Sequence, residues 1–312
     1  MSAIFSILIF PGILFVSVTA LFAEFLDRKI YARLQNRAGP PWFQPFADFI
    51  KLITKEEVVP KDANPTMFKA MPVFAFASSV CAFLYIPLYT AASLFSFDGD
   101  VIVVLYLLTV PTLAFFIGGW YSTSLYSRIG SVRGLMQLFS YEVPLFIGVL
   151  SSAVLADTWS LSELSLFYGS HQWYWAFNLI GFVVCLIALL AKLEKGPFDI
   201  PEAETEIVAG SFTEYSGRHF ALLRLTIDVE MIVGSSFLAA VFLPFGYGFG
   251  PIIGFVIFLL KVLFIICLLS LARTILARMR IDQMISFCWR ILVPLAFVQL
   301  LLNLIIKGVL LR

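Results

Sequence analysis

The amino-acid sequence predicts an all-α fold: a polytopic membrane helix bundle with about eight transmembrane helices and a cytoplasmic-side amphipathic helix. Of its 312 residues, 61% are hydrophobic and 13% are charged, whereas a soluble domain has about 45–50% apolar and about 25% charged residues. The apolar residues form continuous runs such as 251–272, and about 20 such residues cross the hydrocarbon core as a helix. A membrane β-barrel would alternate polar and apolar residues instead.

The apolar runs define the expected spans in chain order. They lie near 3–26, 70–92, 100–121, 134–156, 172–192, 221–245, 250–272 and 288–308. The first run has no basic stretch before it, so we expect a retained helix and not a cleaved signal. No break in composition separates the runs, which predicts a single membrane domain over 1–312.

Positive charges predict the orientation of the bundle, because cytoplasmic loops are enriched in lysine and arginine. Seventeen of the 21 lysines and arginines lie in the loops that follow the first, third, fifth and seventh runs. We therefore expect these long loops in the cytoplasm and both termini outside. The expected location is a prokaryotic cell membrane, within the lipid bilayer.

Residues 44–56 predict a helix that does not cross the membrane. Phe46, Phe49, Ile50 and Ile53 recur at three- and four-residue steps and form one apolar stripe. Such a helix lies in the membrane interface or packs on the bundle, and both placements remain open.

Composition also excludes several kinds of site. The net charge of +1 gives no basic field for nucleic acid. The four cysteines are isolated, so an iron–sulfur cluster in this chain is not expected. With two histidines and no phosphate-binding or nucleophile motif, the sequence predicts no metal ligands, no catalytic residue and no cofactor of its own.

The segment 192–220 is a cytoplasmic acidic loop. Its carboxylates are Glu194, Asp199, Glu202, Glu204, Glu206 and Glu214. Carboxylates crowded in a low dielectric cannot all ionise, so their pKa values rise and they can exchange protons near neutral pH. The alternative is a solvated loop that docks a basic partner, but the interleaved prolines and aliphatic residues favour a packed loop.

Ionisable residues also occur inside the predicted spans, where they are costly and usually mark a pathway. They are Glu142, Asp228, Glu230 and Lys261. Asp228 could simply pair with Arg224 one turn earlier. Lys261 needs a carboxylate partner, for which Glu142 and Glu230 are candidates, or must lose its charge. Together with the acidic loop, these residues predict an ion path into the bundle.

Two basic segments, 27–40 and 272–283, complete the set of candidates. Anchoring at the membrane surface explains most of their charge. A sharper interpretation is that some of them meet an acidic patch on a cytosolic subunit. The candidate partner-interface residues are Arg28, Lys29, Arg37, Arg273, Arg278, Arg280 and Asp282.

These motifs resemble those of a known family, in order and spacing, over nearly the whole chain. They are Asp27–Arg28–Lys29, Gln44–Pro45–Phe46–Ala47–Asp48 with Lys51 and Lys55–Glu56, Ser140–Tyr141–Glu142–Val143, the acidic loop from Pro197 to Gly217, and Lys261 with Arg273–Thr274, Arg278, Arg280 and Asp282–Gln283. The family is subunit 1 of respiratory complex I, the NADH:quinone oxidoreductase. The resemblance implies an eight-helix core on which cytosolic iron–sulfur subunits dock, and an acidic loop that couples redox chemistry to ion movement.

Some features depart from complex I. Only Pro41, Trp42 and Phe43 separate Gly39–Pro40 from Gln44, where complex I proteins have about six more residues. The complex I glutamate early in the sixth helix falls at Ile227, beside Asp228. The short segment, and the Leu243–Pro244–Phe245–Gly246 ending of the sixth span, resemble the energy-converting [NiFe]-hydrogenase branch, which includes membrane-bound hydrogenase and sulfur-reducing complexes.

The sequence therefore predicts a non-redox coupling subunit of an ion-translocating, complex I-like oxidoreductase. The resemblance implies hydrogenase-like large and small subunits and antiporter-like membrane subunits as partners. It places iron–sulfur clusters, and a nickel–iron centre in the hydrogenase case, in those partners. The alternatives are a quinone-binding subunit of complex I, a stand-alone secondary transporter and a purely structural anchor. Inverted repeats and broken helices at mid-membrane, as in many transporters, are not evident in the sequence.

Overall fold

The computed structural model describes residues 3–171, 173–247 and 250–310, and its regular elements are all helices. Seven stretches are long and apolar enough to cross a membrane, which confirms the predicted polytopic bundle. They are α1 (Ala3–Leu8) with α2 (Ile13–Leu34), α4 (Pro65–Leu84), α5 (Asp100–Tyr121), α6 (Leu125–Ala156), α11 (Gly217–Phe242), α12 (Pro251–Ile275), and α13 (Ile281–Phe287) continuing through the π-helical turn η2 (Cys288–Leu292) into α14 (Val293–Leu310).

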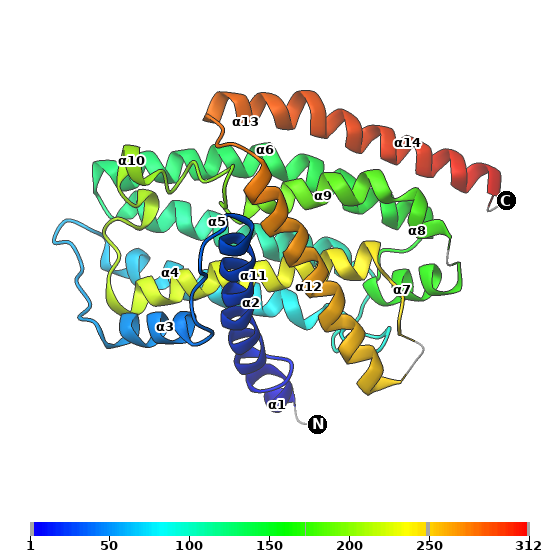
Figure 1. Cartoon of the computed structure of the whole chain (residues 1–312), viewed down its shortest axis with the longest axis horizontal. Coiled ribbons are helices and arrows are strands. Elements are labelled where there is room, and N and C mark those ends of the chain that lie inside the picture. The colour runs from blue at the N-terminus through cyan, green and yellow to red at the C-terminus, as the bar shows by residue number, and fades with distance from the viewer. Residues whose placement is uncertain (1–2, 172, 248–249, 311–312) are drawn as a thin grey trace.

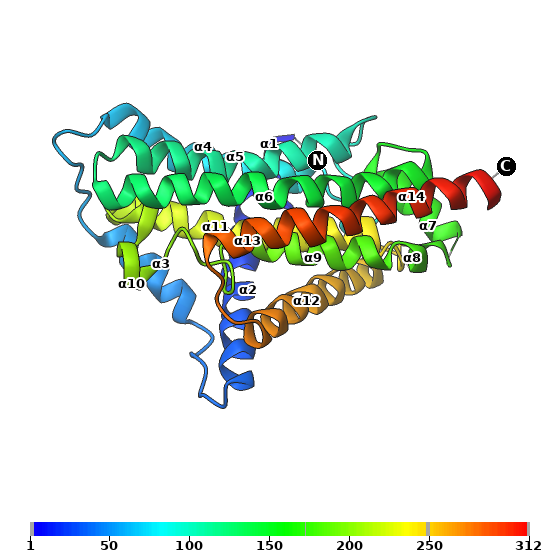
Figure 2. The ribbon, with the colours of Figure 1, turned by 90° about the horizontal axis from the view of Figure 1, so that it is seen from above.

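The helices surround α11, which is the most deeply buried of the seven. Helices α4, α5, α6 and α14 follow the long axis of the molecule, whereas α2 crosses it steeply and α12 runs obliquely (Figures 1 and 2). Helices α2, α4 and α12 all pack against α11, and α14 packs at one edge against α6. This crossing of α2 and α12 leaves room for side chains between them and α11 at one end of the bundle.

The fifth predicted span is shorter than expected. The segment 172–192 contains α8 (Tyr174–Phe177) and α9 (Leu179–Lys192), a helix of 14 residues. The two helices meet at Asn178, whose amide donates to the Tyr168 hydroxyl (2.6 Å) and whose oxygen accepts from Asn303 (2.7 Å). Hydropathy counts a single asparagine as a minor interruption, whereas its amide is held here by neighbouring helices.

The loops predicted to be cytoplasmic gather at one end of the bundle, toward the left of Figure 1. The backbone N–H of Val58 donates to the Ser216 hydroxyl (3.0 Å), and the N–H of Met279 donates to the Pro197 carbonyl (3.1 Å). The end also holds α3 (Gln44–Thr54), α10 (Glu204–Ile207) and η1 (Gly210–Phe212), whereas α7 (Leu161–Ser170) and α8 lie toward the other end.

Helix α6 begins nine residues before the predicted start of its span, because the loop covers its polar first turns. The Ser127 hydroxyl donates to the Ser211 carbonyl (2.9 Å). A Cβ atom on Gly130 would lie only 2.6 Å from the backbone of Gly210, which itself has φ +53°. Two glycines thus allow the acidic loop to lie directly on α6.

Helix α3 has apolar side chains on two sides. Phe46 and Phe49 pack against the bundle core, whereas Ile50 and Ile53 are 61% and 43% exposed. The inward pair holds α3 on the bundle, and the outward pair faces away from it.

Candidate functional site

A cavity of about 630 Å³ opens at the end where the loops gather, between α2, α3, α11, α12 and the acidic loop. Its lining is rich in charge. The charged residues are Glu24, Arg28, Asp48, Lys51, Lys55, Glu194, Lys195, Asp199, Glu202, Arg224, Asp228, Arg273 and Arg278. Ile227 and Asp228 both line it, so the one-residue offset from the complex I glutamate still leaves a carboxylate at the cavity wall.

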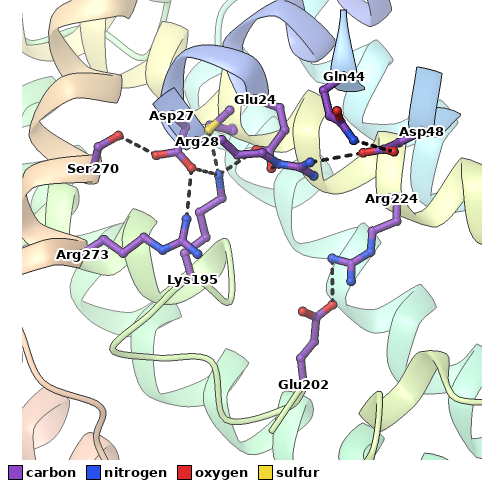
Figure 3. Close-up of polar contacts among 11 residues, drawn as sticks. Glu24, Asp27, Arg28, Gln44, Asp48, Lys195, Glu202, Arg224, Ser270 and Arg273 are labelled. Carbon is purple, nitrogen blue, oxygen red and sulfur yellow. Dashed lines mark hydrogen bonds and ion pairs between the residues drawn. The ribbon is translucent and has the colours of Figure 1, made fainter. Parts of the chain in front are cut away.

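Beside the cavity, Asp27 joins three separate parts of the chain (Figure 3). Its side chain is 2% exposed and accepts from Lys195 Nζ at 2.6 Å, from Arg273 Nη1 at 3.3 Å and from Ser270 Oγ at 2.5 Å. Helix α2 is thereby tied to the acidic loop and to α12 through one carboxylate. A buried carboxylate needs such partners, because leaving it unpaired is strongly destabilising.

Glu24 lies one turn before Asp27 on α2 and shares Lys195 with it. Lys195 Nζ is 3.1 Å from Glu24 Oε2, and Arg28 Nε is 2.7 Å from Glu24 Oε1. Arg28 also reaches Asp48 on α3 at 3.4 Å (Figure 3). Burial by itself lowers the pKa of Lys195, but the carboxylates of Asp27 and Glu24 outweigh it and hold this pKa above its ordinary value.

Three carboxylates of the acidic loop pair with arginines from other parts of the chain. The pairs are Asp199–Arg278 (3.0 Å), Glu202–Arg224 (3.3 Å) and Glu206–Arg133 (2.6 Å). The ion pair of Arg224 is therefore with the loop, and the pairing with Asp228 suggested by their spacing is wrong.

Glu194 is the loop carboxylate that lies deepest. Its Oε2 atom is buried and has no hydrogen-bond partner in the described residues. Burial raises its pKa to about 8, and the nearby carboxylates of Glu202 and Glu230 raise it further than Lys192 and Arg224 lower it. Glu194 can therefore gain or lose a proton near neutral pH, as crowding of the loop carboxylates predicts.

A buried ion pair lies inward of Glu194. Lys192, the last residue of α9, bonds to Glu230 of α11, and each side chain is 2% exposed. Both interact electrostatically with Glu194. Lys192 also interacts with Glu142 of α6, which is half-buried. The structure therefore brings Glu202, Glu194, Glu230 and Glu142 into one series around Lys192, leading from the cavity into the bundle.

Lys261 takes no part in this series. Its Nζ atom lies 4.8 Å from the ring centre of Phe245 and 4.5 Å from that of Tyr247. These rings supply the stabilisation expected from a carboxylate, because a cation is attracted to an aromatic face. The proposed pairing with Glu230 is wrong, since Glu230 is the partner of Lys192.

The remaining ion-path candidates are spread out. Glu206 is 59% exposed, and its hydrogen bond with Arg133 holds its pKa below the ordinary value. Glu214 is half-buried at the end of the loop and is not part of the described cavity lining. Glu204 belongs to α10, and its side chain lies outside the described part of the structure.

The basic candidates divide into two groups. Arg28, Arg273 and Arg278 each pair with a carboxylate of this chain, and Lys29 Nζ donates to the Pro40 carbonyl (3.5 Å). The other three are exposed, namely Arg37, Arg280 and Asp282. Arg278, Arg280 and Asp282 also border a second hollow of about 400 Å³, together with Arg133 and Glu206.

Sequence reasoning missed Glu24, Lys192 and Lys195 as site residues. Glu24, Asp27 and Arg28 stand three and four residues apart, which places them on one helix face, and this is the signal that could have found them. Lys192 and Lys195 look like ordinary loop charges in the sequence. In residues 3–171, 173–247 and 250–310, no group of three or more His, Cys, Asp or Glu is placed to hold a metal ion.

The fold and site define a multi-pass membrane subunit whose charged cavity opens at one end of the helix bundle. A family profile described as NADH dehydrogenase matches residues 6–304. The chain belongs to this family, which is that of subunit 1 of complex I-like respiratory oxidoreductases.

Individual relatives carry a matching description, each being the H subunit of an NADH-quinone oxidoreductase. The protein of Carboxydothermus hydrogenoformans is 33% identical over 300 residues, covering 93% of this chain and 85% of that protein. That of Dehalococcoides mccartyi is 34% identical over 296 residues, covering 93% and 83%. That of Bacillus thuringiensis is 35% identical over 297 residues, covering 90% and 87%.

A solved structure has the same fold. A chain of the membrane-bound sulfane sulfur reductase, an archaeal respiratory membrane complex, superposes with a TM-score of 0.83 at 24% identity, covering 93% of this chain and 96% of that chain. The chain is thus a membrane subunit of a multi-subunit respiratory oxidoreductase.

Proposed function

We propose that this subunit anchors a cytosolic iron–sulfur arm and couples electron transfer in that arm to translocation of protons or sodium ions. The observation that carries the proposal is the series of carboxylates from the cavity inward. Glu194 interacts with Glu202 at the cavity and with Glu230 in the bundle, and Lys192 links Glu230 to Glu142. Ionisable groups inside a membrane are costly and mark ion pathways.

Glu142→Gln tests the coupling role. The amide keeps the size of the side chain but cannot carry an ion, so we expect redox partial reactions to continue while ion translocation stops. The measurement is ion uptake per electron in liposomes that contain the whole complex. Normal uptake in this variant would refute the role. Glu163→Gln is a matched control, because Glu163 belongs to α7, away from the cavity.

We propose protons or sulfur compounds as the terminal electron acceptor, with hydrogenase-like subunits and antiporter-like membrane subunits as partners. The short segment at 41–43 and the fold shared with the sulfane sulfur reductase support this proposal. Metal analysis of the complex purified through this chain tests it. Stoichiometric nickel beside iron supports a hydrogenase-type partner, whereas iron without nickel leaves sulfur or quinone reduction.

A quinone-reducing complex is the second candidate. The cavity beside α3 and the names of the relatives favour it. Extraction of the purified complex distinguishes the two candidates, because bound quinone supports the second and its absence supports the first.

We also propose that the gathered loops face the cytoplasm and that both termini lie outside a prokaryotic membrane. The positive-charge distribution supports this orientation. The second hollow is a candidate contact for the cytosolic arm, since Arg133, Arg278 and Arg280 surround it and an acidic partner segment would complement them. Labelling of a cysteine introduced at Arg37 from each side of the membrane tests the orientation.

A further inference from the structure

Lys195 differs from the other charged contacts of the acidic loop. In the pairs with Arg133, Arg224 and Arg278, the loop supplies the carboxylate to an arginine elsewhere in the chain. Lys195 is the reverse case, in which the loop supplies a cation to carboxylates on α2. Its ammonium contacts Asp27 (2.6 Å), Glu24 (3.1 Å) and the Met231 sulfur (3.1 Å).

The two kinds of contact also differ in burial. In the arginine pairs each side chain is between 24% and 59% exposed, so water can replace either partner at little cost. In the Lys195–Asp27 pair the exposed fractions are 11% and 2%. Withdrawal of Lys195 would leave a buried negative charge that water cannot stabilise. The position of this one loop side chain therefore determines the charge balance inside the bundle.

The two carboxylates are not equally dependent on Lys195. Without it, Asp27 would still have the Ser270 hydroxyl and the Arg273 guanidinium. Glu24 would keep only Arg28 among its ion-pair partners in the described structure, and Arg28 is 43% exposed and also reaches Asp48. Glu24 lines the cavity, whereas Asp27 is not part of the described lining. Glu24 is therefore the group that needs a replacement cation and can obtain one from cavity water.

We propose that Lys195 is a positioning residue that links movement of the acidic loop to protonation of Glu24. With the loop in the present position, its ammonium is the counterion shared by Glu24 and Asp27 (Figure 3). When the loop moves and withdraws Lys195, a hydronium ion in the cavity transfers one proton to a carboxylate oxygen of Glu24, leaving water. When Lys195 returns, that O–H bond breaks and the proton goes back to water.

This inference rests on the proposed coupling function, and it adds the residue through which the loop acts. It also explains why a lysine is buried beside two carboxylates at the base of a loop. An arginine pair at the surface could attach the loop equally well, but would not make the charge of the interior depend on where the loop lies.

The test uses the complete complex with Lys195→Gln, which removes the charge while keeping a polar side chain. In this variant Glu24 is permanently without its shared counterion, so we expect an additional protonated carboxyl group at neutral pH. Infrared spectroscopy detects its C=O stretching band. The band should be absent from the wild type and should disappear again in Lys195→Gln/Glu24→Gln. Ion uptake per electron should be lost in Lys195→Gln and largely kept in Lys195→Arg.

Lys51→Gln is the matched control, because Lys51 is an exposed lysine that lines the same cavity. It should keep normal coupling and show no new band. If Lys195→Gln does not assemble, the charge-compensated Lys195→Gln/Glu24→Gln variant replaces it for the uptake measurement, and normal uptake there would overturn the proposal. So would the absence of the carboxyl band in an assembled Lys195→Gln complex.

The Glu142→Gln variant distinguishes failure of the ion path from failure of the loop lysine. If it pumps normally, the proposed ion path is wrong. If it is uncoupled while Lys195→Gln pumps normally, the path stands and only the role of Lys195 is wrong.

Discussion

Lys192 and Glu230 are buried in the bundle, and each depends on the other for charge compensation. We expect Lys192→Met to lower the free energy of unfolding by about 3–5 kcal/mol, because it leaves the Glu230 carboxylate buried and unpaired. The double variant Lys192→Met/Glu230→Leu should regain most of that loss, since removing both charges also removes the cost of burying them. Unfolding of each variant in detergent by titration with dodecyl sulfate measures the differences. A double variant as unstable as the single one would contradict this account.

Glu194 predicts a pH dependence of stability. Its pKa of about 8 in the folded chain exceeds the ordinary value of 4.5. Between these pH values the folded chain holds a proton that the unfolded chain has released, so stability falls as pH rises through this window. Glu194→Gln should remove the fall and raise stability at pH 9 by about 1–3 kcal/mol, a range that allows for partial solvent screening at the cavity. Melting curves at pH 6 and pH 9 measure it, and equal slopes for variant and wild type would exclude this role.

Individual residues show how far sequence reasoning reaches. The ionisable residues of the spans could be identified because charge is rare in apolar runs. Their partners could not, since pairing depends on how distant segments approach. Glu230 meets Lys192 from 38 positions away, and Lys195 meets Asp27 from 168. Lys261 lacks the carboxylate that its position predicts, because two aromatic rings from the preceding loop surround it.

At the scale of elements, contact between α6 and the acidic loop depends on Gly130. A methyl group there would come within 2.6 Å of the Gly210 backbone, and backbone cannot rotate away as a side chain can. We expect Gly130→Ala to displace the loop and reduce coupled ion uptake while the spans remain folded. Gly308→Ala in α14 is the control, because its added methyl group meets nothing within 4 Å. Uptake and protease sensitivity of the loop measure the effect, and identical behaviour of the two variants would refute it.

Helix α14 illustrates what hydropathy can and cannot show about an element. Its apolar character predicts a span, but its attachment comes from polar residues at four-residue steps. Gln299 donates to the Phe177 carbonyl (2.8 Å), Asn303 to the Ser151 carbonyl (2.8 Å), and Lys307 to Asp157 (2.6 Å). In lipid, such hydrogen bonds join helices that have little hydrophobic reason to associate. The ends of elements were less predictable than their existence, since α6 extends into polar sequence and α9 stops at Asn178.

For the whole molecule, the apolar runs and the grouping of positive charges sufficed to predict a polytopic bundle with its chemically rich loops at one end. The cavity could not be predicted in the same way. It exists because α2 and α12 cross the bundle obliquely (Figures 1 and 2), and crossing angles follow from packing details that one sequence does not reveal.

The shortness of α9 has an electrical consequence. Fourteen residues extend only about 21 Å along a helix, against a hydrocarbon thickness of about 30 Å. A water-accessible cavity beside such a short helix acts as a conductor, so the membrane potential falls mainly across the remaining part of the bundle. Proton entry to Glu194 should then move little charge through the field. Most of the voltage dependence of transport should arise deeper, at the steps beyond Lys192.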